Sequence, residues 1–249
     1  MKNFLYSLFI GLFGMTGLTS IAFLWMYAAQ SKQQAHLYSN LAAVREQDTQ
    51  QETASEPEKQ ASYQNLYWKN TDMVGWILIE DNNIDYPVMQ TQADPNYYLK
   101  HDFERNYTDY GCPFMQADCD ALAPSDNLII YGHNMKDGPM FADLAKYRSK
   151  DFWQSHKTVW FDTALGSSAY EIFSVIHTTV QADDADAFPF YRFVDAAAPE
   201  DFAAYVSACK ARALYDTGIS AEYGDKLLTL STCDNITDNG RWLVIGKRI

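Results

Sequence analysis

The chain has 249 residues, with 32 Asp or Glu against 19 Lys or Arg, and a formal net charge of −13 at pH 7. This acidic balance argues against a nucleic-acid partner, because phosphate groups would be repelled, and it is compatible with high solubility outside the cell. Four cysteines without C-x-x-C spacing argue against a zinc site.

An uncharged apolar run covers residues 4–29, directly after a short N-terminal stretch that carries Lys2. A helix of about 20 apolar residues spans a bilayer, so residues 1–30 are long enough for a transmembrane anchor. A cleaved signal peptide is the alternative, because Tyr27-Ala28-Ala29 could suit a signal peptidase. The run is long for a signal sequence, which favours the anchor, and both interpretations place the rest of the chain outside the cytoplasm.

Two further regions follow the apolar run. Residues 31–60 are rich in Gln, Ala, Ser, Glu and Asp, a composition that indicates a partly helical stalk between membrane and domain. From about residue 61 the composition becomes globular, and residues 61–249 are enough for one well-packed domain.

The globular part predicts mainly strands. A short helix is expected over 63–68, and the two runs 74–79 and 84–89 are typical of a hairpin, since Asp81-Asn82-Asn83 between them tolerates a tight turn. Pro87 should mark an edge or the start of a strand. The other expected strands lie at 112–115, 127–131, 158–162, 169–180, 226–233 and 241–245.

Two helices interrupt these strands. Residues 141–148 form a short amphipathic pattern, and a clear helix begins at Pro199, with acidic residues in its first turn, and runs to about Ala213. The order of elements fits a mostly antiparallel β-barrel with attached helices.

Three cysteines have structural interpretations. Cys209 lies on the apolar stripe of the last helix and is expected to be a buried core thiol. Cys112 and Cys119 could form a disulfide in an oxidising compartment, but an extended strand would separate them by about 23 Å, so a bridge requires a turn between them.

Asp183, Asp184 and Asp186 suggest calcium by residue type, but their spacing is not that of an EF-hand loop, so we expect no metal site.

The fourth cysteine has chemically different neighbours. Cys233 is the last residue of one strand-like run, and Arg241 is the first residue of the next. The run 127–131 is followed by a loop that contains His133. If these strands pair, a thiol, a guanidinium and an imidazole meet at one rim of the sheet. A cysteine attacks only as the thiolate, whose ordinary pKa is about 8.5. Arg241 could favour that form and stabilise an oxyanion, and His133 could protonate a departing amine.

The same residues carry a resemblance to a known family. Leu-Ser-Thr-Cys at 230–233, Tyr-Gly-His-Asn-Met at 131–135 and Arg241, eight residues after the cysteine, resemble the signature of sortases of class B. Residues 70–77 and 97–103 support the resemblance, which covers about 60–249 in the family's order. It implies an eight-stranded sortase barrel with an N-terminal helix, and a helix between strands six and seven that would be the one beginning at Pro199.

The resemblance also implies a function. Sortases are cysteine transpeptidases of Gram-positive surfaces, so Cys233 would attack the Thr carbonyl of a C-terminal sorting motif of the Asn-Pro-x-Thr type in secreted surface proteins. The thioester would then pass to an amine of a cell-wall precursor or of a pilin lysine. His133 and Arg241 would be catalytic, no metal or organic cofactor would be needed, and a single-pass membrane anchor would hold the catalytic domain outside the cell.

Further positions are carried over as substrate contacts. Thr232 or a neighbouring backbone N–H would complete the oxyanion site. The expected substrate-binding residues are Asn96, Leu99, Tyr131, Phe188, Pro189, Ser231, Thr232 and Asp234. Two alternatives stay open, namely a thiol endopeptidase that hydrolyses the peptide and a non-catalytic, membrane-anchored binding domain.

Overall fold

The computed structural model describes residues 2–51, 65–180, 187–237 and 239–249, and within the first helix it describes the side chains of residues 15–46. This helix, α1 (Lys2–Gln51), continues through the predicted anchor and most of the predicted stalk. The chain divides into two compact units, Met1–Asn40 and Leu41–Ile249. Each unit is treated separately below.

The first unit consists of the N-terminal part of α1. Among the residues that the structure describes, no helix combines the length and the apolar character needed to cross a membrane. Side chains of residues 4–14, which belong to the predicted anchor, lie outside the described part of the chain. The anchor over 4–29 therefore stays a prediction.

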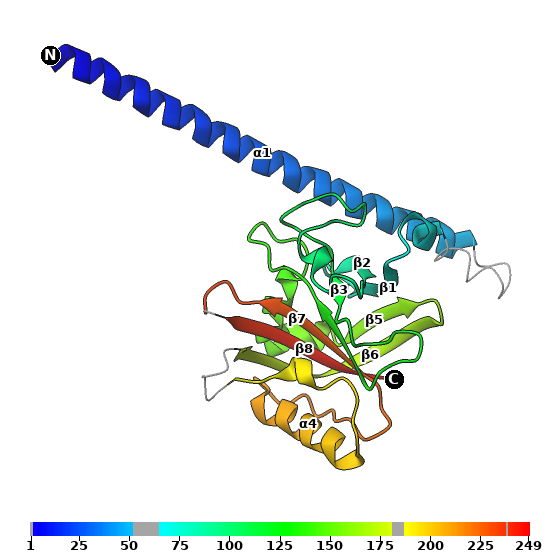
Figure 1. Ribbon diagram of the computed structural model, residues 1–249. Helices are drawn as coiled ribbons and strands as arrows, with labels where there is room; N and C mark the ends of the chain where they lie inside the picture. The colour runs from blue at the N-terminus through cyan, green and yellow to red at the C-terminus, as the bar shows by residue number, and fades with distance from the viewer. Residues whose placement is uncertain (1, 52–64, 181–186, 238) are drawn as a thin grey trace. The chain divides into compact units, whose positions relative to one another are not determined.

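The second unit is built on a closed barrel of eight strands, as predicted (Figure 1). Around the barrel the order is β1-β2-β3-β4-β7-β8-β6-β5. The pairs β2–β3 and β4–β7 are parallel and the other six are antiparallel. The strands are β1 (Met73–Leu78), β2 (Asp85–Met89), β3 (Phe114–Met115), β4 (Asn127–Tyr131), β5 (Thr158–Thr163), β6 (Gly166–Thr179), β7 (Leu227–Cys233) and β8 (Gly240–Arg248).

The predicted hairpin is β1 and β2, and the turn contains Asp81 in the left-handed backbone region at φ 54°. Pro87 lies in the middle of β2, where it faces Trp76 of β1. On its other side β2 pairs with β3 only at Met89 and Phe114. At Pro87, β2 has no ladder partner on the side of β3, so the missing N–H breaks no ladder hydrogen bond.

The helices of the second unit lie outside the barrel. The predicted 141–148 segment is a 3₁₀ helix, η4 (Ala142–Arg148), and a helix that we did not predict, α3 (Lys150–Ser155), follows it. Residues 65–69 are helical and include positions 65–68 of the predicted 63–68 helix, and residues 63 and 64 lie outside the described part.

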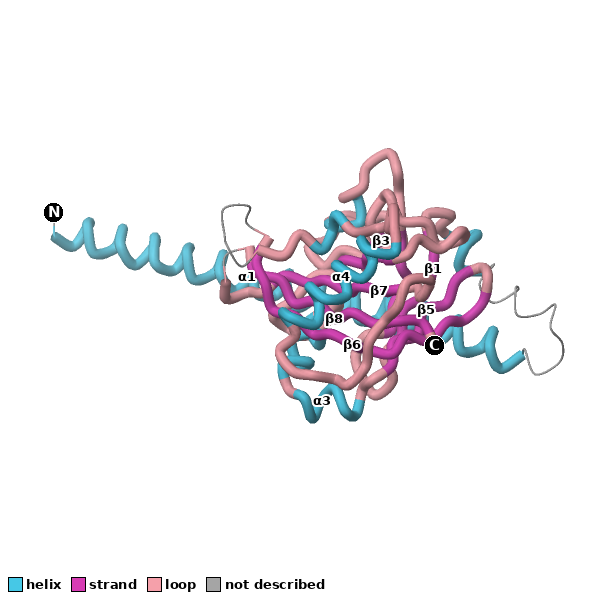
Figure 2. The backbone as a smooth tube through the Cα atoms, turned by 90° about the horizontal axis from the view of Figure 1, so that it is seen from below, coloured by secondary structure: helices cyan, strands magenta, loops and turns pink. Residues whose placement is uncertain are grey.

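The late helix α4 (Pro199–Arg212) agrees with the prediction to within one residue and lies between β6 and β7 in the chain. Figures 1 and 2 both show it against the outside of the barrel. Its buried stripe contains Phe202, Tyr205, Val206 and Cys209. The Ser174 hydroxyl of β6 donates to the Cys209 carbonyl at 2.9 Å, which ties the helix to the sheet.

Cys112 and Cys119 are separate, buried thiols, so the possible disulfide is not formed. Cys112 donates to the carbonyl of Pro87 at 3.5 Å, and Cys119 donates to the carbonyl of Asn127 at 3.4 Å. The two thiols therefore bond to different strands of the barrel. The acidic cluster at 183–186 lies outside the described residues.

Candidate active site

Cys233 lies at the open end of β7, where it is the strand's only exposed residue. In the antiparallel ladder with β8 it faces Arg241. The next backbone bond runs from Asp234 N to Gly240 O at 2.8 Å, so Cys233 and Arg241 form a non-hydrogen-bonded pair. Side chains of such a pair lie on the same face of the sheet and close together. The pairing alone therefore places the guanidinium beside the thiol.

His133 reaches the same face through the parallel pairing of β4 with β7. In that ladder Tyr131 lies beside Ser231. The register continues past the end of β4, because Gly132 N donates to Ser231 O at 3.1 Å and Thr232 Oγ1 donates to Gly132 O at 2.7 Å. Since side chains alternate with a period of two, position 133 falls on the face that position 233 occupies.

Two asparagine side chains connect the loop after β4 to the end of β7, next to the thiol. The side-chain amide of Asn134 donates to the carbonyl of Cys233 at 2.8 Å, and the amide of Asn235 donates to the carbonyl of Asn134 at 3.0 Å. Asn134 belongs to the Tyr-Gly-His-Asn-Met motif, but the sequence assigned it no role. One feature of the sequence could have indicated this role. Asn134 has a short amide side chain next to His133, and such an amide can donate hydrogen bonds to backbone carbonyls of a loop.

The loop after His133 folds back on itself because Gly132 has no side chain. A Cβ atom at Gly132 would lie 2.6 Å from the ring of Phe141. Phe141 also donates its backbone N–H to the carbonyl of His133 at 2.8 Å. The glycine before the histidine therefore permits the packing that fixes the His133 backbone.

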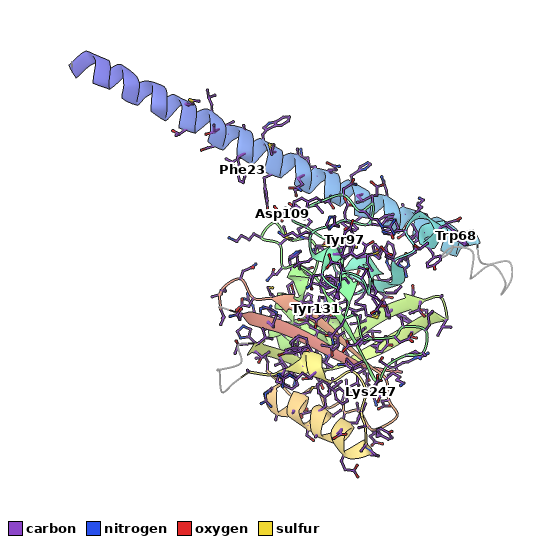
Figure 3. All side chains as sticks on the ribbon, viewed as in Figure 1. Phe23, Trp68, Tyr97, Asp109, Tyr131 and Lys247 are labelled. Atoms are coloured by element: carbon purple, nitrogen blue, oxygen red, sulfur yellow. The ribbon has the colours of Figure 1, made fainter. Side chains whose placement is uncertain are left out.

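A cleft of about 370 Å³ opens over these residues, within the size range of small-ligand sites. Tyr131, which is labelled in Figure 3, is one of the residues that line it. All three predicted catalytic residues and five of the eight predicted substrate-binding residues line it. The lining residues are Pro95, Asn96, Leu99, Phe114, Gln116, Ala117, Tyr131, Gly132, His133, Ser231, Thr232, Cys233 and Arg241.

Phe188, Pro189 and Asp234 do not belong to this lining. Phe188 is buried and stacks on Tyr205 of α4 at 5.7 Å between ring centroids, and Arg212 lies over its ring. Pro189 is exposed, directly before a 3₁₀ turn, η5 (Phe190–Arg192). The family resemblance placed both residues at the peptide, whereas apolar packing draws Phe188 toward α4.

Asp234 organises the turn after the thiol. Its carboxylate accepts a hydrogen bond from His177 Nε2 at 2.9 Å and from the backbone N–H groups of Ile236 and Thr237. Burial opposes ionisation of Asp234, but these hydrogen bonds prevail and its pKa lies below the usual range. His177 also packs against the ring of Trp242. The carboxylate is thus engaged within the protein.

The orientation of His133 is set by a backbone carbonyl. Its Nε2 lies 2.7 Å from the carbonyl oxygen of Leu99, at the end of the 3₁₀ helix η3 (Tyr97–Leu99). A carbonyl only accepts hydrogen bonds, so Nε2 carries the proton whenever this contact is made. Nδ1 is therefore the ring nitrogen that this contact leaves available for proton exchange. Leu99 was expected only as a substrate contact, because a sequence does not show which carbonyl meets which ring.

Arg241 and Tyr131 share the wall of the cleft. The Arg241 guanidinium donates to the carbonyl of Gly240 at 2.9 Å. Burial raises the pKa of Tyr131, although the positive charge of Arg241 acts in the opposite direction. The Tyr131 hydroxyl is therefore a neutral phenol, and it donates to the side-chain oxygen of Gln116.

Exposure separates Cys233 from the other three thiols. Burial raises the pKa of both Cys119 and Cys209 to about 12, so neither is a thiolate at neutral pH. In the part of the chain that the structure describes, no group of three or more His, Cys, Asp or Glu side chains could hold a metal ion. An exposed thiol with a guanidinium and an imidazole on one face suits nucleophilic attack on a carbonyl.

Comparisons with known proteins point to one family. The family model described as a sortase domain matches residues 77–249. A sortase B of Listeria monocytogenes is 39% identical over 184 residues, which cover 72% of this chain and 71% of that protein. A sortase B of Staphylococcus aureus is 29% identical over 173 residues, which cover 70% of this chain and 68% of that protein.

Solved structures show the same likeness. A sortase B–substrate complex of Staphylococcus aureus has a TM-score of 0.79 and 26% identity, covering 89% of this chain and 98% of that chain. The structure of a sortase B complexed with triglycine has the same TM-score and identity, covering 88% of this chain and 99% of that chain. Sortase B from Listeria monocytogenes has a TM-score of 0.64 at 37% identity, covering 74% of this chain and 99% of that chain.

The difference in exposure predicts selective alkylation. Iodoacetamide added to the folded protein should modify Cys233, while Cys112, Cys119 and Cys209 react only after unfolding, because each is buried. Peptide mass spectrometry before and after denaturation measures this. The Cys233→Ala variant should take up no label in the folded state, and rapid labelling of a buried thiol there would contradict the prediction.

Proposed function

The chain belongs to the sortase B family of cysteine transpeptidases, and from this premise we propose that Cys233 is its nucleophile, His133 its general acid and Arg241 the residue that stabilises the oxyanion. The observation that carries the proposal is that strand register alone brings positions 233 and 241 face to face, with His133 lining the same cleft.

In the first half of the reaction the Cys233 thiolate attacks the Thr carbonyl of the sorting motif. Negative charge develops on the carbonyl oxygen, where Arg241 donates a hydrogen bond. The C–N bond then breaks, and the departing amine takes a proton from His133. Because Nε2 of His133 is engaged with Leu99 O, the proton leaves from Nδ1. The product is a thioester between Cys233 and the surface protein.

In the second half an amine acceptor attacks the thioester. His133 takes up the proton that the amine loses, and the Cys233 thiolate leaves as the new peptide bond forms. One peptide bond is exchanged for another, so the chemistry needs no oxidant, reductant or metal. The acceptor is an amine of a cell-wall precursor or of a pilin lysine.

We further propose that the sorting motif is of the Asn-Pro-x-Thr type and that it binds along the cleft. Asn96, Leu99 and Tyr131 form one part of the lining and Ser231 and Thr232 another. Ser231 is suited to a polar contact, because its buried hydroxyl has no hydrogen-bond partner among the described residues. Related sortase B structures are known in complex with substrate and with triglycine, which supports a peptide and an amine as the two reactants.

A peptide assay tests the transfer reaction. The exported domain, residues 61–249, should cleave a fluorescent Asn-Pro-x-Thr peptide and, with a soluble amine, form a transfer product whose yield depends on the acceptor. Cys233→Ala should remove both activities, since no other exposed cysteine is found among the described residues. Mass spectrometry of products and of the Cys233 thioester is the measurement.

The same assay separates the alternatives. Cleavage without any acceptor-dependent product would indicate a hydrolytic thiol endopeptidase. Absence of both the thioester and cleavage with a library of sorting motifs would indicate a non-catalytic binding domain. A matched library with Leu, Ser or Gln in place of the leading Asn tests the proposed motif, which is wrong if Asn gives no preference.

Arg241 gives a second prediction. Arg241→Ala should lower kcat by about 10²–10³-fold, the usual effect of losing an oxyanion donor, with a smaller change in KM. Arg241→Lys keeps the charge but loses the planar fork of donors, so its activity should lie between those of Ala and wild type. Arg248→Ala, an exposed charge at the far end of β8, is the matched control. Equal activity of wild type and Arg241→Ala would exclude the proposed role.

Localisation is the third proposal, and it rests on the uncharged run of residues 4–29. We expect the full chain to fractionate with membranes, resist extraction by high salt or carbonate, and be released by detergent. Protease added to intact cells should remove the C-terminal domain. A chain that begins at residue 31 should be soluble when expressed in the cytoplasm. Recovery of the full chain in the salt wash would contradict an anchor, and a shortened membrane-free form would indicate cleavage.

A further inference from the structure

Outside the cleft, a hydrogen-bonded group of polar side chains holds the segment whose carbonyl orients His133. We propose that Asn70, Tyr98 and Arg105 are positioning residues, which act on His133 by fixing the carbonyl of Leu99. The inference rests on the proposed role of His133 as general acid. None of the three lines the cleft, so an effect on the reaction has to pass through the intervening chain.

Tyr98 is the residue directly before Leu99, and its side chain is almost fully buried at 1% exposure. Its hydroxyl donates to Asp72 Oδ2 at 2.7 Å and accepts from the Asn70 side-chain amide at 2.8 Å. Burial and the neighbouring carboxylate raise the pKa of Tyr98, so the phenol keeps its proton and remains a donor. The two bonds hold the ring, and with it the short η3 helix, against the segment that precedes β1.

Asn70 connects this tyrosine to the next part of the loop. It is buried at 2% exposure, and its amide also donates to the carbonyl of Phe103 at 2.7 Å. Its side-chain oxygen accepts from the Arg105 guanidinium at 2.8 Å, and the same guanidinium nitrogen lies 3.0 Å from Asp72 Oδ2. A buried amide with its donors and acceptor all engaged specifies one geometry.

The backbone of Arg105 is unusual for a residue with a side chain. It adopts the left-handed region at φ 65°, which costs free energy for any residue except glycine. In that conformation Arg105 reaches back to Asn70 and Asp72. The hydrogen bonds of its guanidinium therefore connect this left-handed residue to the segment that precedes β1.

The segment at 111–112 also holds the backbone around Leu99. Cys112 N donates to Tyr98 O at 2.9 Å. Gly111, also in the left-handed region, packs so closely that a Cβ atom there would lie 2.5 Å from Tyr98 O and 2.8 Å from Leu99 O. The Leu99 carbonyl thus lies between His133 on one side and the Gly111 backbone on the other, while Tyr98 prevents η3 from sliding.

The consequence for the reaction is geometric. If η3 shifts, the Leu99 carbonyl leaves His133 Nε2, the imidazole can rotate, and Nδ1 no longer faces the departing amine. A misplacement of about 1 Å at a catalytic group can lower the rate by about 10²-fold. The substrate itself keeps most of its wall, because the β4, β7 and β8 parts of the lining do not depend on this loop.

The test compares two removals of one buried hydroxyl. Tyr98→Phe deletes the bonds to Asn70 and Asp72 and keeps the ring. Tyr147→Phe is the matched control, since Tyr147 is also fully buried and its hydroxyl donates to the carbonyl of His156 at 2.9 Å, away from the cleft. We expect Tyr98→Phe to lower kcat about tenfold with a smaller change in KM, and Tyr147→Phe to stay within about twofold of wild type.

A spectroscopic signature distinguishes positioning from a general loss of stability. In protein labelled with ¹⁵N-histidine, the hydrogen-bonded Nε2–H proton of His133 should be observable in wild type and in Tyr147→Phe, with its assignment taken from its loss in His133→Gln. In Tyr98→Phe it should broaden or disappear, because the acceptor is no longer held. Thermal melts of the two Tyr→Phe variants give their relative stability.

Arg105→Gln provides a variant with little risk of unfolding, since the Arg105 side chain is about half exposed at 47%. It should change kcat and the Nε2–H resonance in the same direction as Tyr98→Phe but less. Wild-type kcat and an intact resonance in both variants, with His133→Gln inactive, would overturn the positioning inference alone. Full activity of His133→Gln would instead overturn the proposed function.

Discussion

The site depends on the parallel pairing of β4 with β7. These strands are about a hundred residues apart in the chain and pair residue by residue from Asn127 with Leu227 to Tyr131 with Ser231. The register then continues through Gly132 and Thr232 into the loop. A shift of one residue would turn position 133 to the opposite face, and the imidazole would face away from the thiol. The register of this ladder therefore determines which side chains meet at the proposed catalytic site.

Burial gives the four cysteines different chemistry. Three are enclosed by the barrel and α4, and the pKa values of Cys119 and Cys209 are raised to about 12 by that enclosure. Cys233 stays exposed because it is the last residue of β7. The next residue, Asp234, turns the chain away from the barrel through hydrogen bonds with His177, Ile236 and Thr237. The fold keeps the other thiols unreactive and exposes one where a guanidinium stands beside it.

The sequence predicted the parts that depend on local pattern. The β1–β2 hairpin, the helix beginning at Pro199 and the strand ends that bear Cys233 and Arg241 follow from alternation, turn residues and helix-start signals. Motif resemblance added the number of strands in the barrel and strengthened the choice of His133. The roles of Leu99 O and Asn134, and the inward packing of Phe188, were not predictable, because each depends on a contact between distant segments. The engagement of Asp234 escaped prediction for the same reason, since its partner His177 lies on β6.

Ile236 follows the Asp234 turn with its side chain 91% exposed, while its backbone N–H is held by the Asp234 carboxylate. The backbone of Ile236 is therefore held by the hydrogen bond to Asp234, and its exposed side chain does not contribute to holding it. A substitution of the Ile236 side chain should therefore leave the turn after the thiol intact. For the same reason it offers an attachment point for a fluorophore that reports on occupancy of the neighbouring cleft.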